Sequence, residues 1–394
     1  MRSRYLVALV PLLAAAPLAA QTALPADFDR YVEGVMADHK VPGLAVAVVK
    51  DGQVVLARGY GVRELGKPAR VDEHTIFGIA SNTKAFTATA LALLVEEGKL
   101  EWDAPVIEYL PWFRLSDPWV TAQLTVRDLL VHRSGLGLGA GDLLWWPAST
   151  YTRREVVERL RYLPLVTSFR SAYAYDNVLY SVAGEVILAV TGESWEQFVQ
   201  DRILTPLGMT DSRIRHPGIG ASPNISSTHA EVDGQVRVIA PFTSDNTNPA
   251  GGITASATDI SRWLMVQLDS GRVAGGEPLF SPATTRQLWN IVTPLTPRVY
   301  TDDRAPLSAN FAGYALGLNV LDYRRHKLVT HTGGLPGFIS RVAMLPELRL
   351  GVAVFTNHES AAMEPIVWRV LDHYLGAEHD WRTTYRVLAE RSAA

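Results

Sequence analysis

The chain has 394 residues, of which 47% are apolar and 20% are charged, a composition typical of one large globular domain or two smaller ones. Its net charge of −3, without long runs of like charge, gives no indication of a nucleic-acid or membrane partner. The sequence contains no cysteine, which excludes disulfides, thiolate nucleophiles and cysteine-ligated metals. We expect no cofactor and no metal.

The first twenty residues have the pattern of a cleavable signal peptide. Arg2 and Arg4 form a basic start, residues 5–16 are apolar, and Leu18-Ala19-Ala20 supplies small residues for cleavage before Gln21. The apolar run is too short for a membrane-spanning helix, and no N-terminal cysteine is present for a lipid anchor. The sequence therefore predicts a periplasmic or secreted protein.

Strand-like segments lie at both ends of the chain. Residues 43–62, "GLAVAVVKDGQVVLARGYGV", contain two apolar runs joined at Asp51-Gly52, which predicts a β-hairpin. Near the C-terminus, residues 326–334, 338–345 and 349–357 predict three more strands. Helices are predicted over residues 27–39, 81–97, 125–134, 151–163, 179–204, 256–270 and 362–376.

This order is typical of an α/β (α+β) protein with a helical subdomain inserted into a sheet. We expect a catalytic domain over residues 21–380, with sheet parts at about 27–80 and 310–377 and a mostly helical part at about 81–310. Residues 381–394 are largely polar and are expected to form a tail.

Ser81 and Lys84 form the only Ser-x-x-Lys pattern in the chain. Residues three apart share one face of a helix, so both side chains point into the same space. A serine at a helix start is close to the positive end of the helix dipole, and a desolvated lysine has a lowered pKa. The pair therefore indicates an activated nucleophile, although chance alone also produces such a pattern.

Tyr175-Asp176-Asn177 is the only Tyr-x-Asn pattern, and it lies in a loop before an apolar helix. A tyrosine beside a lysine ammonium can act as general base, and an asparagine can bridge the lysine and a substrate amide. A packed loop tyrosine followed by a helix-capping asparagine explains the same pattern.

A predicted strand ends in His331-Thr332-Gly333-Gly334. Successive glycines at a strand edge allow close approach of a substrate backbone. A backbone N–H in this segment can form an oxyanion hole together with the N–H of Ser81.

In this order, the three motifs resemble the Ser-x-x-Lys, Tyr-x-Asn and Lys/His-Thr-Gly set of the serine β-lactamase and penicillin-binding-protein superfamily, on its class C and esterase branch. The resemblance covers about residues 27–377. It implies a β-lactamase/transpeptidase-like fold, an antiparallel sheet flanked by helices with an inserted mostly helical subdomain and a site in the cleft between them.

The resemblance also implies residue roles in acyl-enzyme chemistry. Ser81 is the expected nucleophile, Lys84 its proton acceptor or the partner of Tyr175, and Tyr175 the general base that carries the proton to the leaving group. Asn177 is expected to position substrate, and the N–H groups of Ser81 and Gly334 to form the oxyanion hole. Which of Lys84 and Tyr175 takes the first proton stays open.

Two residues depart from the β-lactamase pattern. His331 replaces a permanently cationic lysine that suits a substrate carboxylate; a mostly neutral histidine instead donates a hydrogen bond or helps a proton move. This favours peptides, D-amino-acid amides or esters over β-lactams. Asp176 stands where a small residue is common, and we expect it to face solvent rather than to raise the pKa of Tyr175.

Other residues near these motifs have less defined roles. Trp145 and Trp146 lie where the cleft rim is expected, and either bind an apolar acyl group or pin their loop onto the core. His132, Arg133 and Asp142 are assigned no role.

Three functions remain open. The first is a serine hydrolase of amides or esters, acting on a small molecule or a peptide. The second is a class C-type β-lactamase or D-alanyl-D-alanine carboxypeptidase. The third is a slowly acylating penicillin-binding or non-catalytic binding protein, and the oligomeric state is left open.

Overall fold

The computed structural model describes residues 23–215 and 223–393, so the predicted signal peptide lies outside the described residues. Its centre is an eight-stranded antiparallel sheet with the strand order β2-β1-β12-β11-β10-β9-β8-β7. The strands of this sheet are β1 (Gly43–Lys50), β2 (Gln53–Gly61), β7 (Thr293–Leu295), β8 (Ala312–Tyr314), β9 (Asn319–Tyr323), β10 (His326–Leu335), β11 (Phe338–Leu345) and β12 (Leu350–Thr356).

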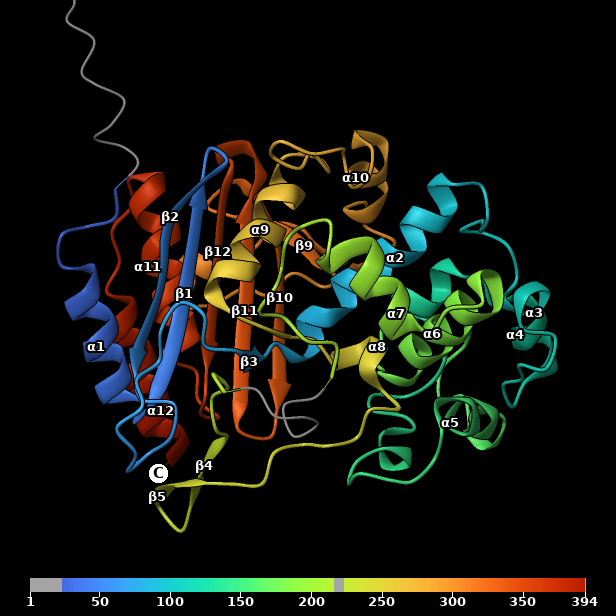
Figure 1. The fold of residues 1–394 in the computed structure, drawn as a ribbon, viewed down its shortest axis with the longest axis horizontal. Helices are drawn as coiled ribbons and strands as arrows, with labels where there is room; N and C mark the ends of the chain where they lie inside the picture. The colour runs from blue at the N-terminus through green and yellow to red at the C-terminus, as the bar shows by residue number, and fades with distance from the viewer. Residues whose placement is uncertain (1–22, 216–222, 394) are drawn as a thin grey trace, which may run out of the picture.

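Helices cover both faces of this sheet and form a separate group beside it (Figure 1). The helices are α1 (Phe28–Asp38), α2 (Thr83–Glu96), α3 (Val106–Tyr109), α4 (Pro118–Gln123), α5 (Arg153–Arg159), α6 (Val178–Thr191), α7 (Trp195–Val199), α8 (Asn248–Gly251), α9 (Ala257–Leu268), α10 (Pro282–Leu288), α11 (Met363–Leu375) and α12 (Trp381–Ala393). Two short strand pairs complete the fold: β3 (Phe77–Gly78) with β6 (Thr254–Ala255), and β4 (His229–Val232) with β5 (Gln235–Val238). None of the helices in the described ranges combines the length and apolar character needed to cross a membrane.

The central strands β1 and β12 are buried along almost their whole length, because both faces of the sheet are covered. One buried cluster joins one face to α2, α6 and α9, and the other joins the opposite face to α1 and α11. The predicted hairpin at Asp51-Gly52 and the strand pairing at the C-terminus are confirmed. The predicted fold class, an antiparallel sheet flanked by helices, is therefore confirmed.

The boundaries of the helical part differ from the expectation. Strand β7 and helix α9 both fall within residues 81–310, yet β7 pairs with β8 at the sheet edge and α9 packs on β1 and β12. The local sequence of a three-residue strand or of a helix does not show which part of the fold it packs against, because tertiary contacts decide this.

Residues 381–393 form helix α12 instead of the expected polar tail. Trp381 is fully buried, and its indole N–H donates to Asp372 Oδ2 of α11 at 2.9 Å. Tyr385, one turn further on, accepts from the indole N–H of Trp368 at 3.1 Å. The segment is polar on average, but its few aromatic side chains fix it to α11.

We expect Trp381→Ala to lower the free energy of unfolding by about 3–5 kcal/mol, because it removes a buried indole and its hydrogen bond to Asp372 and leaves a cavity. The shift of the urea midpoint, followed by fluorescence and by circular dichroism, measures this change. Arg391→Ala at the exposed end of the same helix is the control. A midpoint equal in both variants would show that α12 adds nothing to the stability of the domain.

Candidate active site

Ser81 lies in the 3₁₀ turn Ala80–Asn82 that leads into α2. Ala80 has a φ of 48°, in the left-handed region that non-glycine residues rarely adopt, so the turn before Ser81 is strained. Ser340 of β11 holds this turn: its hydroxyl donates to the Ile79 carbonyl at 2.8 Å and accepts from Asn82 Nδ2 at 2.8 Å. Strand β11 thereby fixes the position of Ser81.

The two glycines at the end of β10 have different roles. A Cβ on Gly333 would lie 2.2 Å from the Ile79 carbonyl oxygen, so glycine is needed there for β10 to pack on the strained turn. Gly334 is exposed, and a Cβ there would meet only a side-chain carbon of Ile339 at 3.4 Å. The prediction that both glycines admit a substrate backbone therefore fits Gly334, whereas Gly333 serves internal packing.

Lys84 is fully buried on the first turn of α2. Its Nζ lies 3.1 Å from Ser81 Oγ, 2.8 Å from Asn177 Oδ1 and 3.0 Å from the Ala250 carbonyl oxygen. Burial of the ammonium lowers the pKa of Lys84 to about 7. A substantial fraction of this lysine is therefore neutral near pH 7, with its nitrogen in reach of the serine proton.

Tyr175 lies against the lysine, whose Nζ is 4.8 Å from the tyrosine ring centroid. Burial raises the pKa of Tyr175, and the Ser81 hydroxyl only partly opposes this shift. The predicted role of Tyr175 as general base requires that its phenol ionise beside the lysine ammonium. The structure differs because loss of solvation outweighs the effect of that ammonium, and the phenol stays protonated.

His331 is only 4% exposed, so its side chain is enclosed by the protein. Its Nδ1 lies 2.5 Å from the Thr332 carbonyl oxygen, so Nδ1 carries the hydrogen, and Nε2 accepts from the Tyr314 hydroxyl at 2.9 Å. Burial lowers its pKa to about 3, and the positive charge of Lys84 adds to this effect. The expectation that His331 donates to substrate or moves a proton is therefore wrong for this geometry: the ring is neutral and both nitrogens are bonded internally.

Asp176 is fully buried, so the expectation that it faces solvent is wrong. Its Oδ1 accepts from the Leu179 N–H at the start of α6, and its backbone N–H donates to His132 Nδ1 at 3.2 Å. The His132 ring in turn stacks 4.2 Å from the ring of Tyr175. The negative charge of Asp176 raises the pKa of Lys84, against the larger effect of burial. Asp176 and His132 thus form a buried support behind the lysine and tyrosine.

Asn177 connects Lys84 to the carboxylate of Asp142, a residue to which no role was assigned from the sequence. Its Oδ1 accepts from Lys84, and its Nδ2 donates to Asp142 Oδ1 at 3.2 Å. Burial raises the pKa of Asp142, and the bond from Asn177 partly opposes it. Gly139 and Gly141, with φ values of 67° and 79°, shape the turn that presents this carboxylate. An acidic residue directly after two closely spaced glycines, in Gly139-Ala140-Gly141-Asp142, was the sequence feature that could have indicated it.

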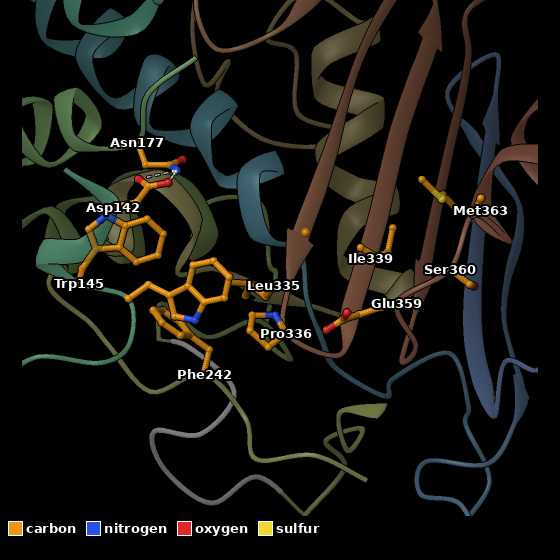
Figure 2. Close-up of a pocket in the computed structure, with 13 residues that line it drawn as sticks. Asp142, Trp145, Asn177, Phe242, Leu335, Pro336, Ile339, Glu359, Ser360 and Met363 are labelled. Carbon is orange, nitrogen blue, oxygen red and sulfur yellow. Dashed lines mark hydrogen bonds between the residues drawn. The ribbon is translucent and has the colours of Figure 1, made fainter. Parts of the chain in front are cut away.

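A cavity of about 790 Å³ opens beside Asn177 and Gly334 (Figure 2). Figure 2 shows Trp145 and Phe242 on the Asp142 side, with Glu359 on the opposite wall. Trp145 is 9% exposed and packs edge-on against Phe242, whereas Trp146 is 53% exposed at the rim. The two predicted roles are thus divided: Trp145 pins its loop to the core, and Trp146 is free to contact a ligand.

Comparison with known proteins identifies the family of the chain. The model of the Beta-lactamase family matches residues 28–375. Unguisins hydrolase ungD of Aspergillus violaceofuscus is 29% identical over 405 residues, which cover 97% of this chain and 71% of that protein.

Two solved structures share the fold. The octameric penicillin-binding protein homologue of Pyrococcus abyssi superposes with a TM-score of 0.76 at 26% identity, over 89% of this chain and 77% of that one. The D-amino acid amidase of Ochrobactrum anthropi SV3 superposes with a TM-score of 0.71 at 23% identity, over 87% and 98% of the two chains. The resemblance predicted from the three motifs is confirmed. The chain belongs to the Beta-lactamase family, and it is a serine hydrolase of that family.

Proposed function

We propose that the protein hydrolyses the amide bond of amino-acid amides or short peptides through a covalent acyl-Ser81 intermediate, with short esters as a second substrate class. Two features of the site carry this proposal. Lys84 is buried, has a pKa of about 7 and lies 3.1 Å from the serine hydroxyl, and His331 is neutral where the β-lactamase pattern has a fixed cation. The first supplies a base for acylation, and the second leaves no fixed positive charge at the His331 position, where the β-lactamase pattern has a lysine.

Acylation begins with neutral Lys84, which takes the Ser81 proton as Oγ attacks the substrate carbonyl carbon. The N–H groups of Ser81 and Gly334 stabilise the resulting oxyanion. When the C–N bond breaks, the protonated phenol of Tyr175 gives its proton to the leaving amine and receives one from the Lys84 ammonium. Water then attacks the acyl carbon while Lys84 takes its proton, and the acyl–Oγ bond breaks as Lys84 returns that proton to Ser81 Oγ and the acid is released. The raised pKa of Tyr175 favours Lys84 as the first base.

The name of one structural neighbour supports an amide substrate, and the name of one curated relative supports hydrolysis. One curated relative is named a hydrolase of unguisins, and one structural neighbour is a D-amino acid amidase. A class C-type β-lactamase or D-alanyl-D-alanine carboxypeptidase is the second candidate, because the serine, lysine and tyrosine of that chemistry are all in place. A slowly acylating binding protein is the third, and the absence of turnover after acylation would identify it.

The test compares kcat/KM for a short-chain aryl ester, a D-amino-acid anilide and its L-enantiomer, and a chromogenic cephalosporin. We expect anilide or ester turnover to exceed cephalosporin turnover at least tenfold. Dominant cephalosporin turnover would overturn the ranking, and a single burst of product without turnover would favour the binding protein.

We also propose that the mature protein begins at Gln21 and acts in the periplasm or outside the cell, since residues 1–20 have the features of an export signal. Mass spectrometry of the N-terminus from periplasmic and culture fractions tests this. A full-length chain confined to the cytoplasm would contradict it.

Asp176→Asn is expected to move the rising limb of the kcat/KM–pH profile to lower pH by about one unit. The aspartate charge raises the pKa of Lys84, so its removal allows the lysine to lose its proton in more acidic solution. Asp201→Asn, at an exposed position, is the control. An alkaline shift, or an unchanged limb in a folded variant, would show that Asp176 does not act on the lysine.

A further inference from the structure

A second cavity, of about 570 Å³, lies next to the first. Ala361 and Met363 line both cavities, so the two meet at the start of α11. The end of β10 borders both: Gly334 lines the first cavity, and Thr332, two residues earlier on the same side of the strand, lines the second. The two cavities therefore lie side by side at the end of β10.

The first cavity carries negative charge. Of the residues that the structure describes, Asp142 and Glu359 line it, and no lysine or arginine does. Among the residues described, neither carboxylate forms an ion pair: Asp142 accepts from Asn177, and Glu359 accepts from the Gly337 N–H at 2.8 Å. Asp142 is half-buried among aromatic rings, and the hydrogen bond from Asn177 and the charge of Lys84 only partly oppose the cost of burying its carboxylate. A cationic ligand group would supply the missing partner.

The second cavity carries positive charge. Arg298, Arg304 and Arg341 line it, and Glu364 is the only acidic residue in its lining within the part of the chain that the structure describes. Arg341 and Glu364 neutralise each other in a close ion pair, and Arg304 bonds to Asp302 at 2.6 Å outside the lining. Arg298 has no ion-pair partner within the described ranges. An anionic ligand group fits this side.

We propose that the preferred substrate is a short peptide with a free ammonium on its acyl part and a free carboxylate on its leaving part; this proposal rests on the proposed amide hydrolysis at Ser81. The acyl part enters the first cavity because the Gly334 N–H, which binds the carbonyl oxygen, lies at its border. The leaving amine then points past Thr332 into the second cavity. Trp146 and Phe242 provide apolar contact for the side chain beside the ammonium.

The test uses one aromatic dipeptide in four forms: unmodified, N-acetylated, C-amidated and blocked at both ends, each with D or L configuration at the acyl residue. We expect N-acetylation to lower kcat/KM at least tenfold and C-amidation to lower it about threefold, because the half-buried carboxylate of Asp142 is desolvated more than the exposed Arg298. The Asp142→Asn variant should lose the penalty for N-acetylation and keep that for amidation. Arg298→Gln should show the reverse.

Asp233→Asn and Arg286→Gln, two exposed positions outside both cavities, are the matched controls and should keep both ratios. Replacing Asp142 can also displace Asn177 and lower the rate for every peptide. The ratio of kcat/KM between two peptides, measured within one variant, cancels this general loss and reports only on recognition of the substrate ends. Equal rates for all four peptides, with an uncharged aryl ester still cleaved by Ser81, would overturn this proposal alone. Failure of every substrate, including the ester, would overturn the proposed function itself.

Discussion

Replacing Ser81 with alanine is expected to lower kcat/KM by about 10⁴-fold or more on any substrate that the protein turns over. The hydroxyl is the atom that forms the acyl bond, and it lies 3.1 Å from the only lysine that reaches it among the described residues. Because the neighbouring strain at Ala80 and the bonds from Ser340 do not involve the Ser81 side chain, the variant should fold normally. Steady-state kinetics together with the melting temperature measures both expectations.

A covalent probe makes the same prediction independent of the substrate. A fluorophosphonate should label Ser81 of the wild type, as shown by peptide mass spectrometry, and should not label the alanine variant. Ser171→Ala, in an exposed loop, is the control and should label like the wild type. An adduct on another residue, or equal turnover by the Ser81 variant, would refute the assignment of the nucleophile.

The second large effect is expected for Lys84→Met, which should lower kcat/KM by about 10³-fold. Methionine keeps the length of the side chain and its apolar contacts but cannot accept the serine proton. In the wild type, kcat/KM should rise with pH through about 7, because the pKa of Lys84 is lowered to about 7 and the neutral amine is the active form. The residual activity of the variant should lack this rising limb.

The pH profile distinguishes a base from a purely electrostatic lysine. If Lys84 served only as a positive charge beside Tyr175, activity would fall as pH rises through about 7, the opposite sign. Lys99→Met, at an exposed lysine that follows α2, is the matched control and should keep both rate and profile. A Lys84→Met variant with the wild-type profile would assign the titration to another group.

Burial shifts the pKa values of Lys84 and Tyr175 in opposite directions, which gives the two residues different roles. Burial lowers the pKa of the cationic acid Lys84 and raises that of the neutral acid Tyr175, since it disfavours the charged form of each. At pH 7 the pair is then a partly neutral amine and a protonated phenol, which suits proton acceptance and proton donation respectively. The sequence left the order of the two open, and their common burial favours the lysine as first base.

Several elements could be predicted from local pattern alone. The Asp51-Gly52 turn, the three C-terminal strands and the spacing of Ser81 from Lys84 depend on contacts within a few residues, and the structure contains each of them. The match of three ordered motifs to one superfamily then supplied the fold. The environment of each motif residue could not be predicted from local pattern. His331 and Asp176 are both buried and bonded to partners from other segments.

The sequence by itself determined the kind of chemistry: a serine hydrolase of the Beta-lactamase family with Ser81, Lys84, Tyr175 and Asn177 in one site. Tertiary structure decided the protonation states, the split between Gly333 and Gly334, and the part played by Asp142. The physical reason is that spacing along a helix or strand fixes which side chains share a face, whereas solvation and charge depend on residues distant in sequence. Asn177 meets Asp142 from 35 positions away, and Lys84 meets the Ala250 carbonyl from 166.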